Sequence, residues 1–282
     1  MQLTPEKVKG KIRSLAKQKN ADARILMRVY MMERFLERIS VSKYKDNFVI
    51  KGGMLITAMV GVSLRSTMDI DTSIKNHTLS EQEARRMIDE IRQIDIEDGV
   101  TFEIKEASSI MDEMEYTGIR LTMNAVMGNL CTPLKIDIST GDVITPHAME
   151  YQYKLLLENR SIDLWSYNLE TILAEKMQTV LARGLLNTRM RDFYDIRILL
   201  SLYDKDINAK VLSDAFAATC KKRGTEILIR TGKTVLDQIK EDAHLRELWE
   251  RYKKKYSYAA EISYESIIKS IESLFATILE NR

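Results

Sequence analysis

The sequence predicts an α+β protein, with a domain of mixed sheet and helices at residues 1–145 and an all-helical bundle domain at 146–282. Apolar and polar residues alternate at 118–127 and 132–139, the period of a half-buried strand. After residue 165 the alternation stops and only helical spacing remains. The chain has just 3 prolines and 11 glycines among 282 residues, which favours long helices and few loops.

Composition restricts the class of protein. Hydrophobic residues make up 45% and charged residues 30%, which excludes a disordered chain. A net charge of +2 neither requires nor excludes a nucleic-acid partner, because local patches decide such binding. Cys131 and Cys220 lack metal-ligand spacing and are expected to be reduced. The polar N-terminus and the shortness of the apolar run 54–64 predict a cytoplasmic protein without a membrane partner.

The elements follow from capping residues and periodicity. Thr4 followed by Pro5 begins a first helix, and Ser80 with Glu83 forms a capping box that begins another. In the first domain we expect helices at 5–19, 22–40, 54–60 and 81–94, and strands at 48–50, 69–71, 100–104, 118–127 and 132–139. In the second we expect helices at 169–184, 190–203, 208–223, 225–241, 243–256 and 263–280.

The stretch 48–75 carries the first chemical signal. A short apolar strand ends in Lys51-Gly52-Gly53, and a helix follows. A helix that begins behind glycines presents free backbone N–H groups and a positive dipole end, which suits a phosphate group. Here we expect nucleotide phosphate to bind.

Carboxylates supply the second signal. Asp69 and Asp71 are two residues apart, so on a strand they share a face, where their mutual repulsion is relieved by a cation such as Mg²⁺ or Mn²⁺. Asp137 alternates with the apolar Ile136 and Ile138, so it points away from the core and is expected to meet the other two. Two surface aspartates at a solvated strand end are the simpler alternative for any lone Asp-x-Asp.

Four motifs in order resemble one family. They are Lys51-Gly52-Gly53, Arg65-Ser66-Thr67-Met68-Asp69-Ile70-Asp71, Leu173-Ala174-Glu175-Lys176 and Arg191-Asp192-Phe193-Tyr194-Asp195. Together they are similar to the AbiEii/AbiGii toxins, nucleotidyltransferases of toxin–antitoxin and abortive phage infection systems with a DNA polymerase β-type core. The resemblance spans roughly residues 45–200. It departs from many polymerase β-type enzymes at Gly53, where those enzymes carry a serine that helps to hold phosphate.

The resemblance implies a site and a reaction. It implies two Mg²⁺ ions on Asp69, Asp71 and Asp137, and transfer of NMP from an NTP, with GTP and pyrimidine nucleotides as candidates. The acceptor it implies is tRNA at its 3′ end or a similar RNA, and the partner a cognate antitoxin that acts without a stable complex. The residues implied to bind the nucleotide are Lys51, Gly52, Gly53, Arg65, Ser66 and Lys176, with Asp192 orienting Lys176 or the attacking hydroxyl.

Other interpretations stay open. From spacing alone, Lys176 is a lysine extending from an ordinary helix, and Arg191, Asp192 and Asp195 are surface ion-pairing residues. The same pocket would also suit a regulatory toxin that binds GTP or another NTP without turnover. A nucleotidyltransferase that modifies a protein or a small molecule is the third hypothesis.

Overall fold

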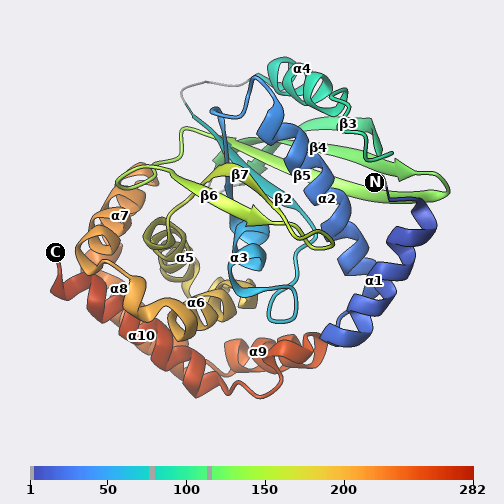
Figure 1. The fold of residues 1–282 in the computed structure, drawn as a ribbon. Helices are drawn as coiled ribbons and strands as arrows, with labels where there is room; N and C mark the ends of the chain where they lie inside the picture. Colours follow the sequence, from blue (N-terminus) through green and yellow to red (C-terminus); the bar gives the residue numbers. More distant parts are fainter. Residues whose placement is uncertain (1–2, 76–79, 113–115) are drawn as a thin grey trace. The chain divides into compact units, whose positions relative to one another are not determined.

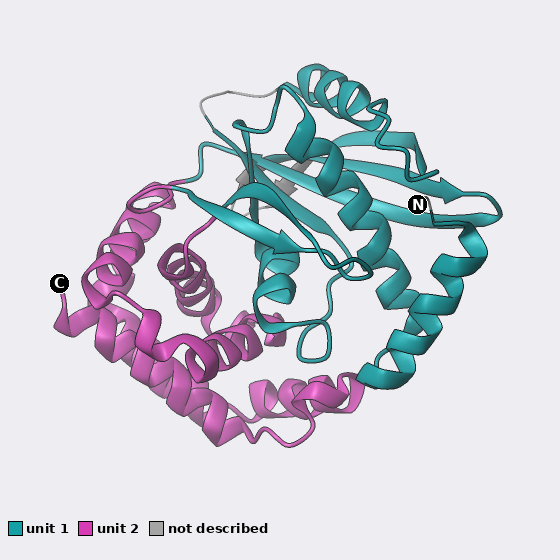
Figure 2. Ribbon diagram, in the orientation of Figure 1, with its two compact units in different colours: residues 1–142, 148–166 teal, residues 143–147, 167–282 magenta. Residues whose placement is uncertain are grey.

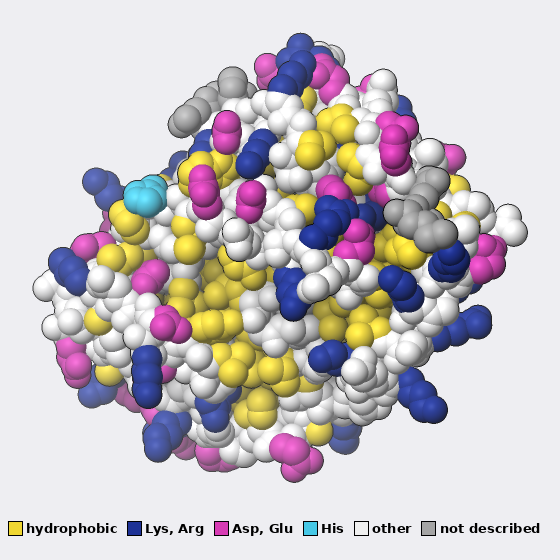
Figure 3. All heavy atoms as spheres, in the orientation of Figure 1, with side chains coloured by type: hydrophobic (Ala, Val, Ile, Leu, Met, Phe, Trp, Pro, Cys, Tyr) yellow, Lys and Arg dark blue, Asp and Glu magenta, His cyan; other side chains and the backbone are white. Residues whose placement is uncertain are grey.

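The computed structural model describes residues 3–75, 80–112 and 116–282. The chain divides into two compact units (Figure 2). The first comprises residues 1–142 and 148–166, and the second comprises residues 143–147 and 167–282. Acidic and basic side chains are interspersed on the face shown in Figure 3, in keeping with the nearly balanced net charge.

A seven-stranded sheet in the order β3-β4-β5-β2-β1-β7-β6 forms the first unit (Figure 1). Its strands are β1 (Phe48–Lys51), β2 (Ile70–Ile74), β3 (Thr101–Asp112), β4 (Tyr116–Met127), β5 (Leu130–Thr140), β6 (Met149–Lys154) and β7 (Ser161–Ser166). β2 pairs with β5 in parallel and β1 pairs with β7 in parallel, while the remaining pairs are antiparallel. The predicted mixed sheet and the α+β class are confirmed.

One face of this sheet forms the core. Leu121 and Met123 of β4, and Ile136 and Ile138 of β5, are buried as their alternation predicted. The helices of the unit are α1 (Pro5–Lys19), α2 (Ala23–Val41), α3 (Gly52–Val60) and α4 (Glu81–Arg92). α2 packs on β5 and β7, α4 packs on β3, and α3 packs on β1 and β2. The capping box at the start of α4 is confirmed, since the Ser80 hydroxyl accepts from Glu83 N–H at 3.2 Å.

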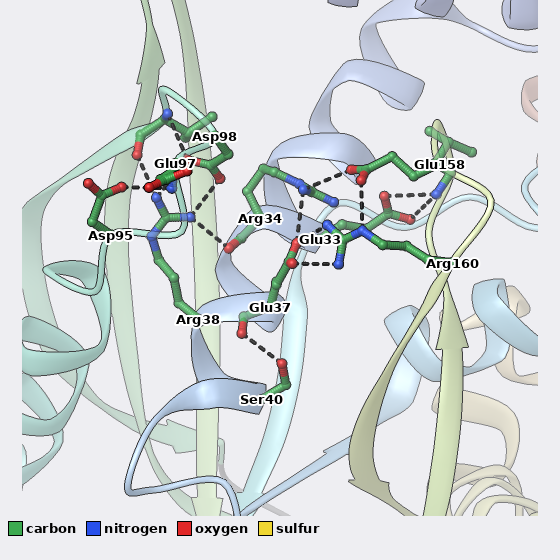
Figure 4. A network of polar contacts seen from close by, with 12 residues as sticks. Glu33, Arg34, Glu37, Arg38, Ser40, Asp95, Glu97, Asp98, Glu158 and Arg160 are labelled. Atoms are coloured by element: carbon green, nitrogen blue, oxygen red, sulfur yellow. Dashed lines mark hydrogen bonds and ion pairs between the residues drawn. The ribbon is translucent and has the colours of Figure 1, made fainter. Parts of the chain in front are cut away.

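Helix α2 departs from an ordinary amphipathic helix, because four of its charged residues are buried. These are Glu33, Arg34, Glu37 and Arg38. Arg38 donates to both carboxylate oxygens of Asp98 at 2.8 Å and to the Val100 carbonyl oxygen at 2.7 Å (Figure 4). This end of the network ties α2 to the segment that leads into β3.

The other end of this network ties α2 to the β6–β7 connection. Arg34 lies 2.9 Å from Glu37 and 3.0 Å from Glu158, and Arg160 lies 2.6 Å from Glu37 (Figure 4). The Glu33 carboxylate accepts from Leu156 N–H at 3.0 Å. Burial raises the pKa of Glu33 to about 8, although the Leu156 N–H and the charge of Arg34 lower it.

The second unit is helical. It contains α5 (Leu169–Arg183), α6 (Met190–Tyr203), α7 (Ala209–Lys222), α8 (Leu228–Glu241), α9 (Ala243–Lys255) and α10 (Tyr264–Glu280), with short 3₁₀ turns at Gly184–Leu186, Asp204–Asp206 and Ser257–Ala259. All six predicted helices are confirmed within a few residues. No helix in the described ranges is long and apolar enough to cross a membrane.

The prediction of an all-helical segment from residue 146 was wrong for β6 and β7. In β7, Ile162 and Leu164 are buried and alternate with exposed Ser161 and Asp163, a pattern of only six residues. The strand is stabilised by a distant partner, since Trp165 pairs with Val49 of β1. Such pairing between distant segments has no local signature in the sequence.

Candidate active site

A row of four charged residues crosses the sheet of the first unit. Lys51 of β1 pairs with Asp71 of β2, Asp71 pairs with Asp137 of β5, and Asp137 pairs with Arg120 of β4. Residues directly opposite one another in a sheet share a face. The row therefore places two carboxylates side by side between two cations, and the expected meeting of Asp71 and Asp137 is found.

Asp71 is the carboxylate of the row whose pKa is raised. Its side chain is half-buried, and its Oδ2 accepts from Gly53 N–H at 2.8 Å. Burial raises the pKa of Asp71, and the charges of Asp137 and Asp69 raise it further. The Gly53 N–H and the Lys51 ammonium act against this rise. A cation beside Asp71 would relieve the repulsion that the protein itself leaves uncompensated.

Asp69 and Asp137, the carboxylates nearest to Asp71, each form an ion pair with a cation of a neighbouring strand. Asp69 lies in a bend just before β2, and its Oδ2 is 3.0 Å from Lys135 Nζ. Asp137 accepts twice from the Arg120 guanidinium, at 2.8 Å and 2.7 Å. Sequence reasoning missed both cations, although each sits at an alternating polar position of a strand that it had predicted.

The glycine turn is built around Asp71. Gly52 has a φ of 54°, and a Cβ there would lie 2.3 Å from Asp71 Oδ2. A Cβ on Gly53 would lie 2.6 Å from Thr67 Oγ1 and 2.7 Å from Arg65 Nη1. Neither glycine accepts a side chain without a shift of its neighbours. Thr67 and Arg65 fill the space beside position 53, so a serine there would collide with both side chains.

Two predicted nucleotide-binding cations are held inside the protein. Lys51 Nζ lies 2.6 Å from Asp142 Oδ2, and both side chains are largely buried. Arg65 is buried and donates to the carbonyl oxygens of Ser66 at 2.9 Å and Gly53 at 3.3 Å. These bonds fix the backbone of the glycine turn, so in this state both cations support the turn.

The second unit brings together its own predicted pair. Lys176 of α5 lies 2.7 Å from Asp192 Oδ1 of α6 and 2.8 Å from Asp195 Oδ2. All three side chains are mostly buried, with exposed fractions of 12%, 16% and 0%. Asp195 was not predicted as a site residue, although its spacing from Asp192 places both carboxylates on one helix face. Two carboxylates hold the Lys176 ammonium in a single position.

Other residues of the second unit have structural partners. Tyr194 is fully buried, with its ring 4.8 Å from that of Tyr258, as expected for a core aromatic. Arg191 donates to the Tyr256 hydroxyl at 3.0 Å. Arg223, which follows α7, has a side chain that is only 4% exposed and that bonds Gln178 and Thr179.

The donor set at Asp69, Asp71 and Asp137 fits a hard divalent cation in its chemistry. Two of the carboxylates are neighbours on one face, and oxygen ligands are those that Mg²⁺ prefers. Among the described residues, no group of three His, Cys, Asp or Glu side chains is already gathered as a metal site. Lys135 pairs with Asp69 and Arg120 with Asp137, so a divalent cation at this site would exchange these ion pairs for metal ligation.

Comparisons with known proteins identify the family of this chain. The sequence profile of a family described as "Nucleotidyl transferase AbiEii toxin, Type IV TA system" matches residues 34–279. Two Helicobacter pylori structures, one described as a candidate nucleotidyltransferase and the other as JHP933, are each 15% identical over 91% of this chain, with a TM-score of 0.48. The match covers 95% of the first and 92% of the second.

A third structure is an antigenic nucleotidyltransferase-like protein from Paracoccidioides brasiliensis, which is 13% identical over 71% of this chain and 90% of its own, with a TM-score of 0.39. A search of curated proteins finds no match. The family profile covers nearly the whole chain and includes every residue of the charged row. This chain belongs to the AbiEii family of nucleotidyltransferase toxins of type IV toxin–antitoxin systems, a membership that implies an NTP substrate and a cognate antitoxin.

Proposed function

We propose that this protein is a Mg²⁺-dependent nucleotidyltransferase that transfers NMP from an NTP to the 3′ end of tRNA. The observation that supports this most strongly is the Asp71–Asp137 pair, side by side on the sheet and next to a glycine turn. A protein that only binds nucleotide has no need of a carboxylate such as Asp137 on the side away from that turn.

The chain's own residues have distinct tasks in this reaction. Asp69, Asp71 and Asp137 would hold Mg²⁺, which supplies neutralisation of the triphosphate and a lowered pKa of the attacking hydroxyl when bound. The glycine turn, with Lys51, Arg65 and Ser66 around it, receives the phosphates. The family resemblance implies that Lys176 binds the nucleotide, and Asp192 and Asp195 hold its ammonium in one position.

The transfer is an in-line displacement. The acceptor hydroxyl oxygen forms a bond to the α-phosphorus, and the bond from that phosphorus to the oxygen bridging the β-phosphate breaks. Pyrophosphate leaves with the bonding electrons, and the hydroxyl proton passes to Asp137. The reaction would act in the cytoplasm, arrest growth, and be countered by an antitoxin that acts without a stable complex.

Labelling tests this proposal directly. Purified protein is incubated with total tRNA, Mg²⁺ and each α-³²P-labelled NTP in turn. Wild-type protein and the Asp163→Asn variant, which changes an exposed carboxylate of β7, should label tRNA with one nucleotide. The Asp71→Asn variant should not. Labelling of a protein or a small molecule, or Mg²⁺-dependent NTP binding without any transfer, would overturn the tRNA assignment and favour the alternative functions.

A further inference from the structure

A pocket of about 360 Å³ lies beside Asp69 on the first unit. It opens where β5 continues beyond the start of β2, because the pairing of these strands begins only at Ile70 and Ile136. Its lining combines an apolar floor, which includes Met123 and Leu134, with polar and charged side chains, namely Arg28, Asp69, Lys105, Thr122, Asn124 and Lys135. Apart from Asp69, which is proposed to hold Mg²⁺, none of its lining residues has a role in the transfer reaction described above.

Several polar groups in the pocket have incomplete hydrogen bonding. Arg28 Nε is buried without a hydrogen-bond partner among the residues that the structure describes. Arg28 Nη1 donates to the thioether sulfur of Met68 at 3.0 Å, and a thioether is a weak acceptor. A guanidinium left in this state costs free energy, which an anionic ligand would recover.

Asn124 and Thr122 add hydrogen-bonding capacity on the same face of β4 as Arg120. Both are half-buried, and neither side chain bonds another residue in the described part of the chain. The amide of Asn124 offers donors and an acceptor together, and Thr122 offers a hydroxyl. Among the residues that the structure describes, Lys105 is paired with its exposed strand neighbour Glu103, at 3.0 Å, a contact of little energy.

The position of the pocket indicates which substrate it would serve. The sheet order places the glycine turn of β1 on one side of Asp71 on β2, and β5, β4 and β3 on the other. In-line transfer needs the attacking hydroxyl and the leaving pyrophosphate on opposite sides of the α-phosphorus. If the triphosphate binds at the glycine turn, the acceptor enters from the side of the pocket.

We propose that this pocket binds the terminal nucleotide of a single-stranded RNA acceptor. Arg28 and Lys105 contact its phosphodiester, and Asn124 and Thr122 hydrogen-bond its base or ribose. The proposal rests on the transferase function for its biological meaning. Occupancy of the pocket itself can be measured without transfer.

The test measures binding of a fluorescent single-stranded RNA octamer with a free 3′ hydroxyl, without NTP, at several salt concentrations. Arg28→Gln should weaken binding about tenfold, since a charge-assisted hydrogen bond is lost. It should also lower the slope of log affinity against log salt by about 0.7, the value for one phosphate contact on a single strand. Arg28→Lys should retain part of the affinity, and Asn124→Ala should weaken binding with the salt slope unchanged.

Lys154→Gln is the matched control, because it removes one charge from an exposed position on β6 of the same unit. Its RNA affinity should equal that of the wild type, and thermal unfolding should show that all variants are folded. A second series measures binding of each NTP with Mg²⁺, which should be unchanged by Arg28→Gln.

RNA affinity in Arg28→Gln equal to that of Lys154→Gln would overturn the proposal. If Arg28→Gln lost NTP binding but kept RNA binding, the proposal would also be overturned, because the pocket would then bind the free nucleotide. These outcomes are separate from failure of the proposed function. RNA binding that depends on Arg28, in a protein that transfers no nucleotide, would support the pocket and reject the transferase.

Discussion

The first unit carries two clusters of charge that differ in how completely they are paired. In the α2 cluster, Arg38 meets Asp98 and Arg34 meets Glu37, and all four side chains are buried or half-buried. In the row across the sheet, Asp71 lies next to Asp137, so two like charges are neighbours. The first arrangement holds three segments together, and the second retains a repulsion that a bound cation would remove.

This difference separates structural from functional charge. Removing one partner of a buried ion pair strongly destabilises a protein, because the remaining charge is left without a partner. A carboxylate that lies next to another negative charge behaves in the opposite way. Its removal should raise the free energy of unfolding, while function is lost. Substitutions in the two clusters should therefore have opposite effects on stability.

The largest effect on stability is expected from Arg38→Met. It leaves Asp98, whose side chain is only 7% exposed, without its guanidinium, and should lower the free energy of unfolding by about 3–5 kcal/mol. Urea denaturation measures this loss. The matched change Arg24→Met, at an exposed pair on the same helix, should lower the free energy of unfolding far less. Equal losses in the two variants would show that the buried cluster has no special role.

The next effect, on transfer activity, is expected from Gly53→Ala in the glycine turn. A methyl group at this position meets Thr67 and Arg65, and the N–H that Asp71 accepts from must move. A displacement of about 1 Å at a reacting centre costs roughly a hundredfold in rate. The comparison variant is Gly61→Ala. It strains the backbone, because Gly61 has a φ of 90°, but its methyl group meets no neighbouring atom, so it should lose less transfer activity than Gly53→Ala. Full activity in Gly53→Ala would contradict the proposed role of the turn.

The pH dependence of the free energy of unfolding should report the ionisation of the buried Glu33. Its pKa is about 8 in the folded protein, above its ordinary value of 4.5, so the folded state keeps a proton that the unfolded state has lost. Stability from this group is present below about pH 4.5 and is lost as pH rises toward 8. The free energy of unfolding should fall by roughly 3 kcal/mol between pH 5 and pH 8.

Glu33→Gln is the test of this assignment. Glutamine keeps an acceptor for Leu156 N–H and cannot ionise, so much of the fall with pH should disappear. Denaturation of both proteins at four pH values makes the comparison. The same slope in both would assign the pH dependence to another group, such as Asp71, whose pKa is raised in the same direction.

The sequence predicted what depends on local pattern. Helix starts at Thr4 and Ser80 have local capping residues, and Asp137 was placed by the alternation of its own strand. Lys135 and Arg120 were missed as partners, because the register that joins β2 to β5 and β5 to β4 depends on residues far apart in the chain. The burial of Arg34 and Arg38 was missed for the same reason, since their partners lie in distant segments.

The central claim is that Asp71 belongs to a cation site. The most direct measurement is the free energy of unfolding of wild type and Asp71→Asn at pH 7.5, with and without Mg²⁺. Without Mg²⁺ the variant should be the more stable protein, because the raised pKa of Asp71 shows that its charge is unfavourable in the fold. Mg²⁺ should stabilise the wild type by mass action and leave the variant unchanged. A wild type that gains no stability from Mg²⁺, or a variant that gains as much, would contradict the account.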